Sequence, residues 1–215
     1  MAALFADRAA AGRVLADRLR AYAGRADVVV AALACAGVPV ACEVAALLSA
    51  PLELMPVRRL WVPGQVGVSM GAMVKGAVHV DGKVLLRHGV SALQLDKVIS
   101  TETVELLRRE AMFQGVHDSQ LLEGRIVIVV DDGIATGATM SAALKALRQA
   151  KPAWVVVAVP VAPARAQDRI DPAADEFVCL ESPANFDGIA SSYADYRTVT
   201  DEQVRRMVEL GRRLF

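Results

Sequence analysis

Cysteine and histidine, the side chains that build disulfides and most zinc sites, are scarce in this sequence. The 215 residues include three of each, no CxxC pair occurs, and the histidines stand far apart along the chain. A structural zinc site gathers several such ligands at short, regular spacings. We therefore expect no zinc site, and the few unpaired cysteines favour a reducing, cytoplasmic setting.

An excess of one charge and long apolar runs are also absent. Lys plus Arg and Asp plus Glu both number 24, so the net charge is zero and no positive field is available to hold a polyanion. The longest apolar runs, such as residues 28–35, are far shorter than the roughly 18 residues that a membrane span requires. Residues 1–8 lack a signal-peptide pattern. We expect neither a membrane nor a nucleic acid as a partner.

Short β-rich apolar runs alternate with helical periods, which is typical of a parallel sheet covered by helices. Apolar residues make up 54% of the chain, which is long enough to bury a full core, so we expect an α/β fold in a single domain over residues 1–215. The expected strands are 27–33, 52–57, 70–74, 125–130, 153–159 and 176–180. The expected helices are 7–23, 38–49, 92–113, 139–150, 164–170 and a last one from residue 201.

The segment between the second and third expected strands breaks this pattern. Residues 58–75 are rich in glycine and contain a proline, so a long loop is predicted that runs into the strand near residue 70. Further on, the dipeptide Asp81-Gly82 separates two short apolar stretches. An Asp-Gly pair in this setting is typical of a two-residue hairpin turn, so a β-ribbon is predicted there.

Residues 126–140, with the sequence IVIVVDDGIATGATM, carry the clearest chemical signal. A buried strand ends at Asp131 and Asp132, and open α/β sheets bind ligands at the carboxyl ends of their strands. The small residues that follow let backbone N–H groups approach an anion, and a helix beginning near Thr139 directs its positive end to the same point. Thr136 and Thr139 add hydroxyl donors.

Two carboxylates beside such an anion cradle suit vicinal hydroxyls, which donate hydrogen bonds to them. The segment therefore predicts a site for a sugar phosphate. Taken separately, adjacent acids at a strand end also fit a plain turn, and TGAT also fits an ordinary helix cap. The Walker and dinucleotide motifs do not compete, because neither GxxxxGK[ST] nor GxGxxG occurs in the chain.

The segment resembles the motif with which type I phosphoribosyltransferases bind phosphoribosyl pyrophosphate (PRPP). The resemblance, to a group of bacterial phosphoribosyltransferase-like proteins, extends over nearly the whole chain through FADRAAAGRVLADRL, VRRLWVPG and YADYRTVTDEQV. It implies a Rossmann-like parallel sheet flanked by helices, with a small hood formed by parts of the termini and a β-ribbon flap.

The resemblance also implies roles for the residues of the motif. Asp131 and Asp132 would hold the ribose hydroxyls, with Asp132 the first candidate for a general base on the attacking nitrogen. The loop that binds the 5-phosphate would consist of Ala135, Thr136, Gly137, Ala138 and Thr139. Mg²⁺ would be bound mainly by the oxygens of PRPP, so no protein ligand is assigned to it.

Two further segments correspond to the pyrophosphate site of the family. The first is the loop Ala34, Cys35, Ala36 and Gly37, where relatives tend to carry Pro-Arg-Gly-Gly, so this chain lacks an arginine that would pair with the leaving group. Cys35 is either a reactive thiol or a small buried side chain whose apolar neighbours raise its pKa. The second segment contains Arg58 and Arg59, which by the resemblance would bind the phosphates. Alternatively, they are two solvated basic residues at the start of a loop.

Residues 60–75 would form the flap that closes over the reacting centre, and Trp61 within it would either stack on the ligand or anchor the loop.

The implied function is that of a pentosyltransferase, a glycosyltransferase of nucleotide metabolism. It would move the phosphoribosyl group of PRPP to a nitrogen acceptor such as a nucleobase, release pyrophosphate and act as a homodimer. The altered loop 34–37 favours an alternative, a regulator that binds PRPP or a nucleotide without turnover. A related hydrolase or another phosphoribosyl-handling enzyme is a third possibility. Nothing in the sequence names the acceptor.

Overall fold

The computed structural model of the protein describes residues 3–65, 67–113, 122–170 and 174–212. Its strands are β1 (Val28–Ala34), β2 (Leu52–Pro56), β3 (Arg58–Trp61), β4 (Ser69–Val74), β5 (Ala77–Val80), β6 (Ile126–Val130), β7 (Trp154–Val161) and β8 (Glu176–Glu181). Its α-helices are α1 (Arg8–Arg18), α2 (Val38–Leu48), α3 (Gly82–His88), α4 (Ala92–Met112), α5 (Ala138–Gln149) and α6 (Asp201–Arg212). Short 3-10 helices are η1 (Arg20–Tyr22), η3 (Ala166–Arg169) and η4 (Ala190–Ser192).

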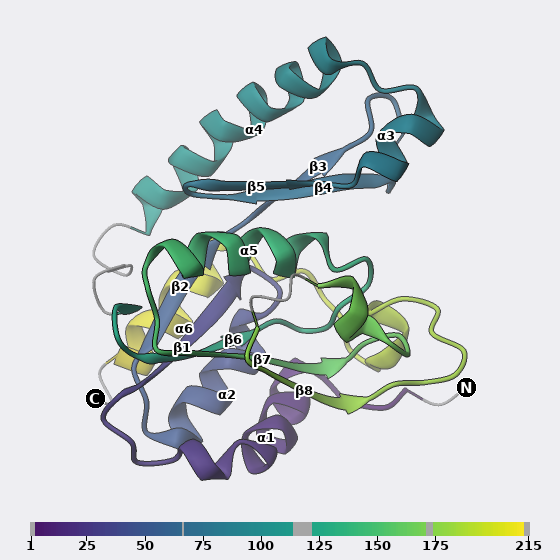
Figure 1. The fold of residues 1–215 in the computed structure, drawn as a ribbon. Coiled ribbons are helices and arrows are strands. Elements are labelled where there is room, and N and C mark those ends of the chain that lie inside the picture. The colour runs from purple at the N-terminus through teal and green to yellow at the C-terminus, as the bar shows by residue number, and fades with distance from the viewer. Residues whose placement is uncertain (1–2, 66, 114–121, 171–173, 213–215) are drawn as a thin grey trace.

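Five strands form a parallel sheet in the order β2-β1-β6-β7-β8 (Figure 1). In the register of the central strands, Val30 lies opposite Leu52 on one side and Ile128 on the other. These strands are runs of Val, Ile, Leu and Ala because a parallel sheet with helices on both faces buries every side chain. The predicted α/β fold with a parallel sheet is confirmed.

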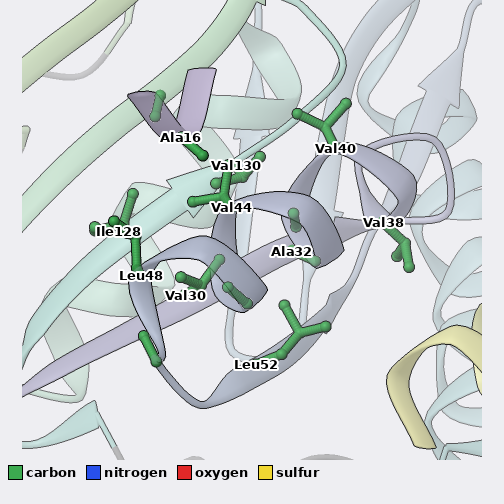
Figure 2. Close-up of a cluster of buried hydrophobic side chains, with 14 of the residues drawn as sticks. Ala16, Val30, Ala32, Val38, Val40, Val44, Leu48, Leu52, Ile128 and Val130 are labelled. Carbon is green, nitrogen blue, oxygen red and sulfur yellow. The ribbon is translucent and has the colours of Figure 1, made fainter. Parts of the chain in front are cut away.

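Alternate side chains of each strand enter two separate cores. Val30 and Ala32 of β1 point with Ile128 into a core shared with α1, α2 and α6, whereas Val29 and Ala31 point into a core shared with α5 and β4. Figure 2 shows α2 laid over the first of these faces, with Val44 and Leu48 directed at the strands. Because both faces are filled, the sheet offers only its edges and strand ends to a ligand.

A second layer, residues 58–112, stands above α5 in Figure 1. Its antiparallel sheet has the order β3-β4-β5, and α4 packs on it through a core that includes Leu60, Met70 and Leu106. The prediction of a loop from residue 58 was therefore wrong at its start. Residues 58–61 pair with β4 as a strand, because Leu60 alternates with exposed neighbours and is fully buried.

The predicted hairpin at Asp81-Gly82 is also wrong, although a β-ribbon does form. The ribbon joins β4 to β5 and turns at Lys75 and Gly76, where glycine adopts a φ of +79°. Asp81 instead caps α3, since its side chain accepts hydrogen bonds from the amides of Lys83 at 2.9 Å and Val84 at 3.3 Å. An Asp before an apolar helical run is a strong N-cap, and here that preference prevails over the turn.

The two terminal segments meet at one end of the parallel sheet. The backbone of Phe5 bonds to those of Ser192 and Ala194, and its ring lies 5.6 Å from that of Tyr193. Whether these segments form a hood over an acceptor stays a prediction. Among the helices in the described part of the chain, none combines the length and the apolar composition that crossing a bilayer requires.

Candidate functional site

The central strand β6 delivers two acids to the carboxyl end of the sheet. Asp131 is 8% exposed and Asp132 only 1% exposed. The amide of Asp132 donates a 2.9 Å hydrogen bond to Oδ1 of Asp131, which fixes the orientation of the first carboxylate. β6 ends at Val130, which pairs with Ala32 and Ala158, so both neighbouring strands continue past this turn and flank it.

Asp131 is the carboxylate that borders open space. Burial and the neighbouring Asp132 charge raise its pKa well above the usual range, while Arg59 opposes that shift. An acid held in such surroundings with a cleft beside it is a candidate for ligand contact.

Asp132 instead accepts hydrogen bonds from an N-terminal and a C-terminal segment of the chain. Its Oδ2 accepts 2.8 Å hydrogen bonds from Nε of Arg8 and from the hydroxyl of Tyr196. The Arg8 guanidinium also stacks 3.7 Å above the Tyr196 ring, and the hydroxyl of Tyr193 donates to the Asp132 carbonyl at 2.5 Å. Both side-chain donors therefore reach the same oxygen, Oδ2. The carboxylate is therefore fixed from one side.

The predicted phosphate loop lies beside Asp131. Gly137 precedes α5 with a φ of +87°, and the amide of Ala138 donates to the Thr136 hydroxyl at 3.4 Å. Ala135, Thr136, Gly137 and Thr139 line a small cavity of about 160 Å³ together with Asp131 and Arg59. The side chain of Ala138 is buried, so this residue can contribute its backbone to the loop.

The predicted pyrophosphate residues lie on the other side of Asp131. Cys35, Ala36, Arg58, Arg59 and Asp131 border a cleft of about 430 Å³, which Arg8, Trp61, Arg109, Thr139 and Tyr196 also line.

Gly37 packs directly against the backbone at the end of β6, with no side chain between the two. A Cβ there would stand 2.8 Å from Cα of Asp131. Ala34 ends β1 opposite Pro56. The structure thus gathers both predicted segments around one carboxylate.

The two arginines of β3 differ in their partners. Arg58 is paired with Glu102 of α4 at 2.6 Å. Arg59 borders both cavities, and its guanidinium lies 5.9 Å from the centre of the Trp61 ring. Trp61 is 38% exposed and also borders both cavities. It is therefore a strand residue beside the cleft.

The Cys35 thiol is protonated at neutral pH. Burial, together with a hydrogen bond to Asp201, raises its pKa to about 11. The sulfur donates to Oδ1 of Asp201 at 3.2 Å, which connects the loop to the start of α6. The interpretation of Cys35 as a small buried side chain fits this geometry better than a reactive thiol.

Three residues at this site received no role there from the sequence. Arg8 and Tyr196 reach Asp132 across 124 and 64 positions of sequence, and Arg109 arrives from the end of α4. The available signal for Arg8 was its helical spacing, since it lies three and seven residues before the buried Ala11 and Leu15. A charged side chain on a buried helix face needs an oppositely charged or hydrogen-bonding partner, because burying it alone is costly.

The fold and the site together define a class: a Rossmann-like α/β domain whose strand ends present one carboxylate between the small-residue loop 135–139 and an arginine-lined cleft. The chain belongs to the phosphoribosyl transferase domain family, whose pattern it matches over residues 3–197, and it has the type I phosphoribosyltransferase fold.

Two proteins of Mycobacterium tuberculosis strains, each named "putative phosphoribosyl transferase", are 41% identical to it over 213 residues. The match covers 99% of this chain and 48% of theirs, so the chain spans about half the length of these curated relatives.

Two solved structures are similar to this chain. The crystal structure of TT1426 from Thermus thermophilus is 36% identical, with a TM-score of 0.75 over 95% of this chain and 97% of that one. A Neisseria gonorrhoeae protein solved with bound ppGpp shares the fold, at 17% identity and a TM-score of 0.51 over 95% and 92% of the chains.

Proposed function

We propose that this domain binds PRPP and transfers its phosphoribosyl group to a nitrogen acceptor, with release of pyrophosphate. The observation that carries the proposal is the position of Asp131, where the cavity of loop 135–139 meets the arginine-lined cleft. An anion cradle, a carboxylate and a cationic cleft follow one another in the order of the 5-phosphate, the ribose and the pyrophosphate of PRPP.

Different residues bind different parts of PRPP. The amides and hydroxyls at the start of α5 bind the 5-phosphate, as expected at a helix N-terminus preceded by a glycine-containing loop. Asp131 accepts hydrogen bonds from the ribose hydroxyls. Asp132 as general base stays a prediction; Arg8 and Tyr196 occupy its Oδ2, so Oδ1 would do this work.

Transfer passes through a cationic ribose as pyrophosphate leaves, so the protein mainly positions groups and stabilises charge. Bound Mg²⁺ supplies neutralisation of the phosphate charge. Among the described residues no three metal-ligating side chains gather, and Asp131 provides carboxyl oxygens beside the cleft. This donor set fits an ion held mainly by PRPP. The acceptor, the homodimer and the cytoplasmic setting stay predictions.

Calorimetric titration with PRPP, with and without Mg²⁺, tests the proposal. The wild-type protein should bind PRPP, and Asp131→Asn should weaken binding at least about tenfold, because a charged hydrogen-bond acceptor is lost. Asp17→Asn is the matched control, since Asp17 is an exposed residue of α1. Absence of binding to the wild type at millimolar PRPP would overturn the proposal.

One observation favours the second candidate, a regulator that binds without turnover. Loop 34–37 carries the neutral Cys35 thiol, held by Asp201, at the position of the missing arginine. The double variant Cys35→Arg, Ala36→Gly should then raise the rate of pyrophosphate release from PRPP with a nucleobase. An unchanged rate counts against this loop as the limit on turnover. Since one fold neighbour was solved with ppGpp, this nucleotide is a suitable probe for the regulator.

A further inference from the structure

Loop 34–37 lines the cleft through Cys35 and Ala36 and contains no cationic side chain. Four arginine side chains line that cleft from elsewhere in the chain: Arg8, Arg58, Arg59 and Arg109. A leaving pyrophosphate carries several negative charges, so its site needs guanidinium or ammonium groups that are not already engaged.

Two of these arginines form ion pairs with acidic side chains. Arg8 is 7% exposed and bonded to Asp132 at 2.8 Å, and Arg58 is bonded to Glu102 at 2.6 Å. Breaking either pair would leave a carboxylate in partly or wholly buried surroundings without its partner. Neither guanidinium is therefore free to turn toward a ligand.

Arg109 is the opposite case. Among the residues that the structure describes, its nearest acid oxygens are those of Asp201 at 3.7 Å and Glu105 at 3.9 Å, both beyond hydrogen-bond distance. Its Nε is buried and has no hydrogen-bond partner in the described part of the chain. A guanidinium donor in this condition has capacity for an incoming acceptor, and a buried donor without one is costly.

Arg109 also faces the right loop. It borders the cleft with Cys35 and Ala36, and its charge acts on the Cys35 thiol, where it opposes the rise in pKa caused by burial. The side chain comes from the last turn of α4, in the layer formed by residues 58–112. It thus reaches loop 34–37 from the second layer of the fold.

We propose that Arg109 binds the pyrophosphate end of PRPP and takes the place of the arginine that loop 34–37 lacks. This inference rests on the proposed function. In the reaction, the acceptor nitrogen lone pair forms the bond to C1 of the ribose, and the C1–O bond breaks with its electron pair going to pyrophosphate. The nitrogen then loses its proton to a carboxylate or to water, while Arg109 and Arg59 stabilise the charge on the leaving group.

The test compares Arg109→Gln with Arg108→Gln. Arg108 is the adjacent residue of α4, is 52% exposed and also faces Asp201 at 3.7 Å, but it does not line the cleft. Inorganic pyrophosphate, PRPP and ribose 5-phosphate are titrated into each protein. Arg109→Gln should weaken pyrophosphate and PRPP about ten- to hundredfold and leave ribose 5-phosphate within about twofold, while Arg108→Gln leaves all three unchanged. Arg109→Lys should recover part of the loss.

The outcomes separate the two proposals. Equal weakening of ribose 5-phosphate, or unchanged pyrophosphate affinity in Arg109→Gln, overturns the role of Arg109 while PRPP binding by the wild type stands. Failure of the wild type to bind PRPP overturns the proposed function and this inference with it. Thermal melting of each variant checks that it is folded.

Discussion

At the residue scale, burial of the Asp131 carboxylate lowers the stability of the fold, while the same carboxylate is proposed to bind the ligand. Its pKa is raised by burial and by Asp132, so the folded state binds this proton more tightly than the unfolded chain does. Stability from this group is therefore highest below the unfolded pKa of about 3.9 and falls as the pH rises through the folded pKa.

Asp131→Asn should consequently raise the melting temperature at pH 7.5 by a few degrees, since no buried charge remains and the amide oxygen can still accept from Asp132. The gain should disappear near pH 4, where the wild-type acid is protonated as well. Calorimetric scans at both pH values measure this. A lower melting temperature for the variant at pH 7.5 would show that the charge stabilises the fold.

Arg8 stabilises the fold, because its ion pair connects α1 to the buried Asp132. Arg8→Ala should lower the free energy of unfolding by about 3–5 kcal/mol, the typical cost of leaving a buried charge without its partner. Arg13→Ala, on the same helix, removes a pair with Glu43 in which Arg13 is 58% exposed, and should cost at most about 1 kcal/mol. Urea denaturation compares the two, and similar losses would show that Asp132 needs no arginine.

At the element scale, the turn after β1 is built around a backbone contact. A Cβ on Gly37 would stand 2.8–2.9 Å from backbone atoms of Leu33, Val130 and Asp131, and none of these can move without shifting a central strand. Gly37→Ala should destabilise the protein by about 1–3 kcal/mol and weaken PRPP binding. Gly82→Ala is the control, because nothing lies within 4 Å of its added Cβ. Equal stability of both variants would contradict the tight contact.

The main sheet could be predicted from sequence because β1, β6 and β7 are uninterrupted apolar runs, and the two acids and the small-residue loop directly follow β6. Asp81 and Arg58 show where local patterns fail: the same Asp-Gly pair suits a hairpin or a helix cap, and tertiary pairing decides between them. The Arg8–Asp132–Tyr196 contacts could not be inferred at all, since no local pattern specifies pairing across 64 to 124 positions.

At the scale of the whole molecule, the candidate site lies where two layers meet. The parallel sheet contributes Asp131 and the loop of Cys35, while residues 58–112 contribute Arg58, Arg59 and Arg109. The Arg58–Glu102 pair fixes β3 to α4 within the second layer. A ligand in the cleft therefore contacts both layers, and its binding should restrict their relative motion.

Because the five strands of the main sheet are parallel, their carboxyl ends lie at one edge of that sheet. A bound ligand should therefore slow amide exchange at that edge alone. PRPP should slow amide hydrogen exchange in loops 35–37 and 135–139, which lie about a hundred positions apart but border one carboxylate. Loop amides at the opposite edge, in residues 25–27 and 124–125, exchange through local opening and should keep their rates. Mass-spectrometric exchange with and without PRPP measures both edges in one experiment. Equal slowing at both edges would indicate general stabilisation, and slowing in loop 135–139 without loop 35–37 would mean that only the phosphate end of the ligand is bound.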